Sequence, residues 1–268
     1  MCTRDSKAGF VGKPGGLNTF EFTAMPSIPV DILREILEHV RYTDLATLCR
    51  VNKIFCSYSR DVLYREIGGD AHVVQTLAQS TDLARRVRSF QTRQLFPKLA
   101  TALRNMSSLG KLNLWDSRGV SILDGCTFKL NSFTCSFPNS ESLRRFLNSQ
   151  PSLTHVTLYE RYEPVSPFDE RCLPNLTRVV AEPSWLRTLI PGRPVREVIV
   201  HSPSRIYSTD LSFFTLSTTP IQKLSIHYAM LYPKPVSLLV SIFPTLVYLQ
   251  VNAYAVDWTV RVLLCLSN

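Results

Sequence analysis

The sequence predicts an α/β protein in which a small N-terminal helical module precedes a long repeat array with a parallel sheet on its concave face. Two observations carry this prediction. Apolar residues stand at helical spacing between residues 28 and 67, and a six-residue apolar pattern recurs from residue 109 onward. Of the 268 residues, 45% are apolar, which excludes a chain that is disordered throughout. We expect a flexible tail (1–24), the helical module (25–68) and the array (69–268).

The helical module shows the apolar spacing of three short helices. Pro29 stands where a first helix begins, and apolar residues on one face follow it through Val40. Thr43 and Asp44 are expected to cap a second helix, and a third is expected over 57–67, ended by two glycines. Three short helices bury little surface by themselves, which indicates a module that works together with a partner.

Short sequence blocks in this module match a known interaction motif. They are an apolar residue before Pro, a Glu-Ile-Leu core, an Asp-Leu pair, a Val followed by an aromatic residue, and a Leu-Tyr-Arg block. In this chain they fall on Ile28-Pro29, Glu35-Ile36-Leu37, Asp44-Leu45, Val51 with Phe55, and Leu63-Tyr64-Arg65. The pattern resembles the F-box over about 40 of the 268 residues. It departs at Ile28, where Leu is usual, and at Phe55, where Trp is common, but both remain apolar.

The resemblance implies a partner for the module: the Skp adaptor of a cullin–RING ubiquitin ligase. Each apolar residue of the motif has two possible roles, contact with the adaptor or packing of the three helices, and we expect about half of them to take each role. The candidate adaptor-binding residues are Ile28, Pro29, Ile32, Ile36, Leu37, Leu45, Leu48, Val51 and Phe55.

The array is predicted from an apolar-x-x-apolar-x-apolar pattern that recurs at intervals of 19 to 26 residues. This period resembles the leucine-rich repeat, in which each copy supplies a strand and then a helix or irregular turn. The Asn that usually follows each strand is absent, so we expect an irregular array. A weaker eighth copy is expected at Ala84, helices at 99–106, 142–148 and 236–242, and a further helix after the last strand. The seven copies begin at Leu109, Leu130, Leu153, Leu176, Val195, Ile221 and Leu246.

The residues between the apolar positions of each copy are expected to face the concave surface, because side chains alternate along a strand. Trp, Tyr and Arg are typical anchors of protein interfaces. The alternative is a solvated face that binds nothing. His201 and His227 share one offset in consecutive repeats, but the pattern places no third ligand beside them, so we predict no metal site. The candidate substrate-binding residues are Trp115, His155, Tyr159, Arg178, His201, His227 and Tyr248.

The sequence lacks the common catalytic motifs GxSxG, HExxH, GxxxxGK[ST] and GxGxxG, so we expect no enzyme activity, no catalytic residue and no cofactor. The 7 cysteines form no CxxC pair, and the longest apolar stretch is too short for a membrane helix. We therefore expect reduced thiols, a cytoplasmic or nuclear location, and no membrane partner.

The formal net charge of +9 is unevenly distributed. The helical module carries six basic and six acidic residues, whereas residues 69–118 carry eight basic and three acidic ones. A nucleic-acid role needs a basic stripe with interleaved aromatic residues, and a solvated flank of the array is favoured here over that role. An acidic target surface is a further possibility.

Three hypotheses about function remain open after the sequence analysis. The leading one is a substrate-recognition subunit of a Skp–cullin–F-box ubiquitin ligase, in which the repeats bind the target protein. The alternative is a leucine-rich-repeat scaffold or binding protein without a ligase role. A basic nucleic-acid-associated protein ranks third.

Overall fold

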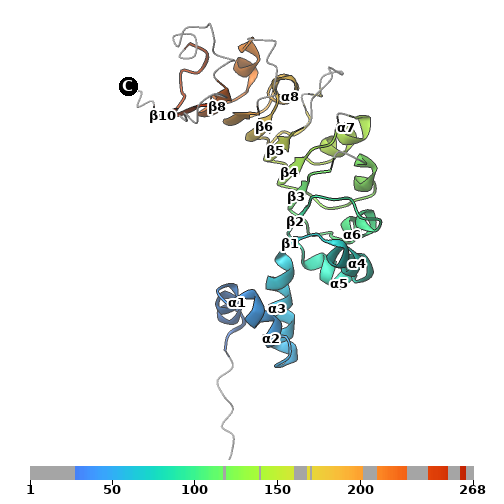
Figure 1. The fold of residues 1–268 in the computed structure, drawn as a ribbon. Coiled ribbons are helices and arrows are strands. Elements are labelled where there is room, and N and C mark those ends of the chain that lie inside the picture. Colours follow the sequence, from blue (N-terminus) through green and yellow to red (C-terminus); the bar gives the residue numbers. More distant parts are fainter. Residues whose placement is uncertain are drawn as a thin grey trace, which may run out of the picture. The chain divides into compact units, whose positions relative to one another are not determined.

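The computed structural model describes residues 28–116, 119–138, 140–159, 168–169, 171–201, 210–227, 241–252 and 260–263. The chain divides into two compact units, residues 1–39 and 40–268, and each is described here by itself. The described elements are helices and strands in the order shown in Figure 1.

Helix α1 (Val30–Glu38) is the described element of the first unit. Pro29 precedes it, as expected for a residue whose missing N–H costs nothing at a helix start. Leu33 and Leu37 are buried, whereas Ile32 and Ile36 are about half exposed, at 49% each. The helix therefore presents one buried apolar stripe and one exposed apolar stripe.

The second unit begins with α2 (Tyr42–Leu48) and α3 (Lys53–Arg65). The predicted cap of α2 is wrong: Arg41 precedes the helix, and Asp44 lies in its first turn, where its carboxylate accepts a 2.9 Å hydrogen bond from the Arg41 Nε. Helix α3 begins earlier than predicted because the Asn52 side chain accepts a 2.9 Å hydrogen bond from the Phe55 N–H and caps it.

A ten-stranded sheet follows in the described part of the chain, and its strand order is the sequence order (Figure 1). Neighbouring strands are parallel from the first to the ninth, and the tenth pairs antiparallel with the ninth. The strands are β1 (Glu66–Gly68), β2 (Ser89–Thr92), β3 (Lys111–Leu114), β4 (Ser132–Cys135), β5 (His155–Leu158), β6 (Arg178–Ala181), β7 (Glu197–Val200), β8 (Lys223–His227), β9 (Tyr248–Asn252) and β10 (Val260–Leu263).

Two of these strands correct the predictions. Strand β1 begins directly after α3, in the segment where the third helix of the module was expected to continue. Strand β10 occupies residues 260–263, where a helix was expected after the last repeat. The predicted parallel sheet itself is confirmed.

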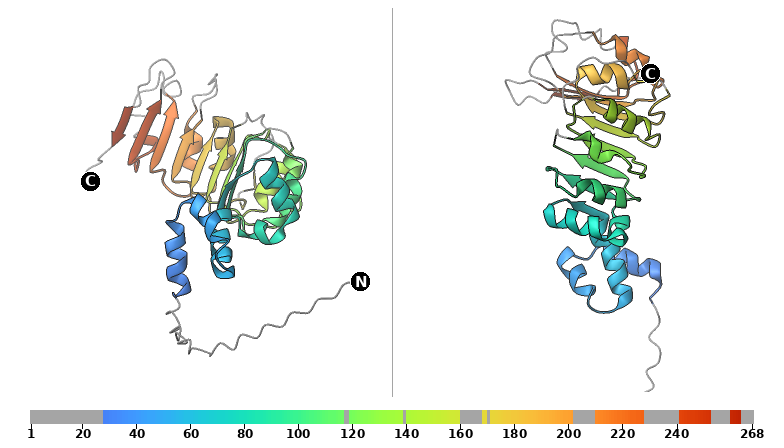
Figure 2. Two further views of the ribbon diagram at one scale, coloured as in Figure 1. Left: turned by 60° about the horizontal axis from the view of Figure 1, so that its bottom comes forward. Right: turned by 90° about the vertical axis from the view of Figure 1, so that its right-hand side faces the viewer.

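Helices cover one face of this sheet (Figure 2). We call this the covered face and the other the open face. The predicted helices at 99–106 and 142–148 are confirmed by α6 and α7, and residues 236–240 of the third prediction lie outside the described residues. The helical elements between strands are α4 (Ala71–Gln79), α5 (Thr81–Arg86), α6 (Leu99–Asn105), η1 (Val120–Leu123), α7 (Glu141–Asn148), α8 (Pro183–Leu189) and η2 (Ser212–Leu216).

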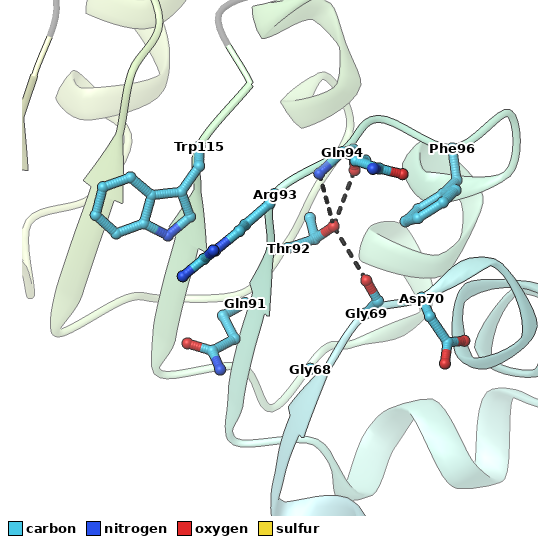
Figure 3. Close-up of a pocket in the computed structure, with 9 residues that line it drawn as sticks. All are labelled: Gly68, Gly69, Asp70, Gln91, Thr92, Arg93, Gln94, Phe96 and Trp115. Carbon is cyan, nitrogen blue, oxygen red and sulfur yellow. Dashed lines mark hydrogen bonds between the residues drawn. The ribbon is translucent and has the colours of Figure 1, made fainter.

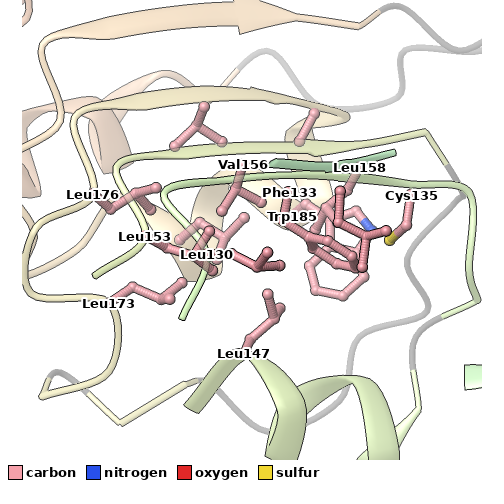
Figure 4. Packing of buried hydrophobic residues seen from close by; sticks show 14 of the residues in the cluster. Leu130, Phe133, Cys135, Leu147, Leu153, Val156, Leu158, Leu173, Leu176 and Trp185 are labelled. Atoms are coloured by element: carbon pink, nitrogen blue, oxygen red, sulfur yellow. The ribbon is translucent and has the colours of Figure 1, made fainter. Parts of the chain in front are cut away.

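The core lies between the sheet and these helices, and the apolar positions of the recurring pattern build it (Figure 4). The register aligns equivalent positions on neighbouring strands, so that Phe133 of β4 pairs with Val156 of β5. The eighth copy of the pattern begins at Val87, three residues after the predicted Ala84. The register shows this, because Phe90 of β2 pairs with Leu112, the second apolar position of the next copy. Ala84 is also buried, but it belongs to helix α5.

Two buried polar side chains, Gln150 and Arg193, bind backbone groups in the connections between strands. The Gln150 Oε1 accepts a 2.9 Å hydrogen bond from the Leu130 N–H, and its Nε2 donates to the Phe128 carbonyl oxygen at 3.3 Å. The Arg193 guanidinium donates to several backbone carbonyl oxygens, including that of Cys172 at 2.8 Å. Buried backbone groups need such partners, so these residues stabilise the turns between strands.

Candidate functional site

The helices before the sheet expose apolar side chains that a folded chain ordinarily buries. Seven of the ten large apolar side chains that are exposed in the described part of the chain lie between residues 28 and 54. Exposed apolar side chains that are this frequent in a short segment indicate that the segment binds a protein partner. The seven are Ile28, Val30, Ile32, Ile36, Tyr42, Val51 and Ile54.

The nine predicted adaptor-binding residues divide by exposure. The structure leaves five exposed, Ile28, Pro29, Ile32, Ile36 and Val51. Two, Leu48 and Phe55, are half-buried, and the other two, Leu37 and Leu45, are only 1% exposed. Burial of that degree assigns Leu37 and Leu45 to packing within the chain, as was expected for part of the set.

Three further exposed residues, Val30, Tyr42 and Ile54, were not among the predicted ones. Val30 stands next to Pro29, and Ile54 stands next to Phe55, and both neighbours belong to the motif pattern. This proximity is the signal in the sequence that could have identified the two residues. Their exposure adds apolar area to both units without adding charge.

Three thiols of the described chain have raised pKa values. Burial raises the pKa of Cys49, and the neighbouring Cys56 raises it further. Burial raises the pKa of Cys126 to about 11 and also raises that of Cys172. A thiol is nucleophilic as the thiolate, and a raised pKa disfavours that form in these three side chains.

An aromatic row crosses the open face at the carboxyl ends of the strands. The rings of Trp115 and Tyr159 stack with centroids 4.8 Å apart, and Tyr159 meets His201 edge-on at 5.1 Å. These residues follow β3, β5 and β7, and the parallel register brings them together although 42 to 44 residues separate them in the sequence. Three of the seven predicted substrate-binding residues thus form one continuous surface.

A charged row lies at the amino ends of β5, β6 and β7. The register places His155, Arg178 and Glu197 on three successive strands, and the Arg178 Nε lies 3.2 Å from the Glu197 Oε1. Burial lowers the pKa of His155, the Arg178 charge lowers it further, and Glu197 opposes both. Glu197 was expected on the concave surface, because it occupies the same offset in its repeat as Arg178, but it was not among the seven candidate substrate-binding residues.

The last two predicted residues lie toward the end of the sheet. The Tyr248 hydroxyl donates a 3.0 Å hydrogen bond to the Gln250 Oε1, and Tyr248 lines a hollow of about 560 Å³. The backbone of His227 belongs to β8, and its side chain lies outside the described residues. Among the described residues, no group of three His, Cys, Asp or Glu side chains is placed to hold a metal ion.

The comparison with protein families decides the identity of the helical segment. The model of the F-box domain matches residues 25–66, which span α1, α2 and α3. Residues 25–66 are an F-box domain. F-box domains bind Skp-type adaptors, and the exposed apolar residues of this F-box domain lie within the matched segment.

The F-box match ends where β1 begins, so it does not extend over the sheet. A comparison with curated proteins found no match to the chain. Within the described residues, no helix has the length and apolar character that a membrane crossing requires.

Proposed function

We propose that this protein is a substrate-recognition subunit of a Skp–cullin–F-box ubiquitin ligase. The F-box domain binds the Skp adaptor, and the open face of the sheet binds the target protein. The F-box match over residues 25–66 is the observation that carries the proposal.

Apolar contact dominates the proposed binding of the adaptor. The F-box segment holds six basic and six acidic residues between 25 and 68, so net charge gives it no attraction for a partner. Full burial of an exposed aliphatic side chain contributes about 1.5–3 kcal/mol. Side chains such as Ile32 and Ile36, each 49% exposed, supply the apolar area that an adaptor buries.

We interpret the sheet and its helices as an irregular leucine-rich-repeat array. The support is the parallel pairing of β1 to β9 in sequence order, together with the burial of each recurring apolar position. Such arrays use one uncovered face for binding, and the aromatic row from Trp115 to His201 lies on that face. No residue of this chain takes part in chemistry: the subunit raises the concentration of the target near the ligase. It acts in the cytoplasm or nucleus.

Capture of the Skp adaptor by the purified full chain tests the first half of the proposal. The variant Ile36→Asp puts a charge on the exposed stripe of α1 and is expected to weaken capture by at least about 30-fold, the effect of losing an interface hot spot. Leu216→Asp is the matched control, because Leu216 is also an exposed aliphatic residue (56%) but lies in η2 of the array.

Three outcomes of this experiment are decisive. Capture by the wild type and by Leu216→Asp, with loss in Ile36→Asp, supports the proposal. Failure of the wild type to capture the adaptor overturns the ligase role and leaves a binding or scaffold protein. Equal loss in both variants also overturns it, because adaptor binding then does not use the F-box surface.

Affinity purification from cells with and without proteasome inhibition tests the second half. A target of this subunit is expected to be retained more strongly when degradation is blocked, and to be lost from the variant Trp115→Ala. If the same proteins are retained in equal amounts under both conditions, the chain binds partners without directing their degradation.

A further inference from the structure

Two hollows along the sheet each combine an aromatic side chain with a cation. The first, of about 500 Å³, is lined by Arg93 and Trp115 at the ends of β2 and β3 (Figure 3). The second, of about 560 Å³, is lined by Lys223 and Tyr248 on β8 and β9. Within the described residues, the side chains of Arg93 and Lys223 form no ion pair or hydrogen bond.

The first hollow is held in shape by the loop that follows β2. The buried Thr92 hydroxyl lies 2.9 Å from the Gln94 carbonyl oxygen and 3.2 Å from that of Gly69, and it accepts a hydrogen bond from the Gln94 N–H (Figure 3). The Gly69 N–H donates to the Gln91 carbonyl oxygen at 2.7 Å. These contacts fix the backbone on both sides of the hollow.

The charge of Arg93 is available to a ligand. Asp70 also lines this hollow, but its carboxylate accepts a 2.8 Å hydrogen bond from the Val73 N–H and caps helix α4. Trp115 is 43% exposed, although its ring stacks on Tyr159. The hollow thus offers an apolar surface and a guanidinium side by side.

The second hollow repeats this combination. Its apolar lining includes Ile199, Val247 and Tyr248, and Val247 is 56% exposed. Glu197 also lines it, but its carboxylate is paired with Arg178 at 3.2 Å. The ammonium of Lys223 is therefore the charge that this hollow presents to a ligand.

We infer that the target, under the proposed function, is held through an extended acidic segment with two anchor points, each an apolar residue next to a carboxylate. One anchor occupies the hollow of Arg93 and Trp115, and the other occupies the hollow of Lys223 and Tyr248. Five strand steps separate β3 from β8. At about 4.8 Å per step they span about 24 Å across the sheet. The second hollow also lies four residues nearer the amino ends of the strands, because Lys223 begins β8 whereas Trp115 follows β3. With about 13 Å along the strands, the anchors lie about 27 Å apart, which an extended peptide covers with about eight residues.

Nucleic acid fits this surface less well than an acidic peptide. Bases bind single-strand binding proteins by stacking on free aromatic faces. Trp115 and Tyr159 stack on each other, and Tyr159 also packs against His201, so the row offers few free faces. Carboxylates of Asp70 and Glu197 line the two hollows as well and oppose a continuous phosphate backbone.

Selection from a phage-displayed library of random peptides, about 16 residues long so that both hollows can be spanned, tests the inference on the full chain. The expected result is enrichment of peptides with two apolar–acidic pairs about eight residues apart. Enrichment of peptides without acidic residues overturns the inference, and so does the absence of enrichment over a blank surface.

Fluorescence anisotropy with the most enriched peptide then locates the site. Trp115→Ala is expected to weaken binding by at least about 30-fold, and the double variant Arg93→Glu/Lys223→Glu by about tenfold or more. Lys98→Glu is the matched charge reversal, because Lys98 precedes α6 and lines neither hollow. If Lys98→Glu weakens binding as much as the double variant, or if a single-stranded oligonucleotide displaces the peptide, the inference is wrong.

Adaptor capture by the same variants separates this inference from the proposed function. The double variant is expected to capture the Skp adaptor as well as the wild type does. If the adaptor is captured but no acidic peptide is selected, the two-anchor inference fails alone. If acidic peptides are selected but the adaptor is not captured, the ligase role fails alone.

Discussion

The F-box domain and the sheet use the same kinds of aliphatic residue in opposite ways. In the sheet, positions such as Leu112, Val156 and Val198 are at most 1% exposed and pack under the helices of the covered face. In the F-box domain, Ile36 and Val51 are 49% and 60% exposed. The first set contributes to the stability of the chain by itself, whereas the second contributes when a partner covers it.

This contrast teaches that the two regions divide stability and binding between them. Substitutions of apolar residues in the sheet are expected to change folding first, and those on the exposed F-box surface are expected to change adaptor capture first. On the open face of the sheet, the proposed binding of a target uses polar and aromatic side chains between the buried positions.

The largest expected effect compares one buried and one exposed apolar residue. Phe133 is fully buried and packs against Phe146 at a ring-centroid distance of 5.2 Å. Phe133→Ala is expected to lower the free energy of unfolding by about 3–5 kcal/mol. Ile36→Ala is expected to change it by less than about 1 kcal/mol, because Ile36 is about half exposed. Urea unfolding followed by circular dichroism measures both, and equal losses contradict the division.

A second comparison uses adjacent glycines where the F-box match gives way to the sheet. A Cβ added at Gly69 clashes with the ring of the buried Phe90, whereas a Cβ added at Gly68 meets no atom within 4 Å. Gly69→Ala is expected to lower the free energy of unfolding by about 1–3 kcal/mol through overpacking. Gly68→Ala is the matched control and is expected to have little effect. Similar unfolding midpoints for the two variants contradict this packing of Gly69 on the sheet.

A third comparison removes one helix cap from each region. Asn52 caps α3 of the F-box domain through a 2.9 Å hydrogen bond from the Phe55 N–H, and Ser140 caps α7 through one of 3.2 Å from the Leu143 N–H. Substitution of either by Ala is expected to lower the free energy of unfolding by about 1 kcal/mol. The two variants differ in function, because Asn52→Ala also loosens the turn that holds Phe55. Adaptor capture is expected to fall for Asn52→Ala alone, and an equal fall for Ser140→Ala is the contrary result.

The period of the apolar pattern predicted the strands of the sheet well because it depends on burial alone. Each of the seven copies from Leu109 to Leu246 corresponds to a strand whose pattern positions pack on the covered face. The start of the eighth copy was predicted at Ala84 and lies at Val87. Both residues are apolar and they stand three positions apart, so the pattern fits either start, but Ala84 belongs to helix α5. Strand β1 was missed because its three residues are too few to show a pattern.

The exposure of the F-box residues could not be predicted from spacing. Leu33 and Leu37 stand four residues apart, as do Ile32 and Ile36, so the two pairs are equivalent in the sequence. The fold buries the first pair and exposes the second. On the sheet, alternation along the strands did predict that Trp115 lies on the open face. The hollow beside it depends on the loop after β2, which local patterns do not specify.

The smallest expected effect concerns pH and the charged row of the open face. Burial and then Arg178 lower the pKa of His155 below its ordinary value of 6.5, with Glu197 opposing them. A histidine with a lowered pKa in the folded state binds protons more readily when unfolded. Its contribution to stability is therefore present above pH 6.5 and is lost as the pH falls through that value toward the folded pKa. The melting temperature of the wild type is expected to fall more steeply than that of His155→Gln on acidification from neutral pH, by a small margin because the side chain is exposed. Parallel pH profiles for the two proteins contradict a lowered pKa of His155 in the folded state, whereas a steeper wild-type profile supports it.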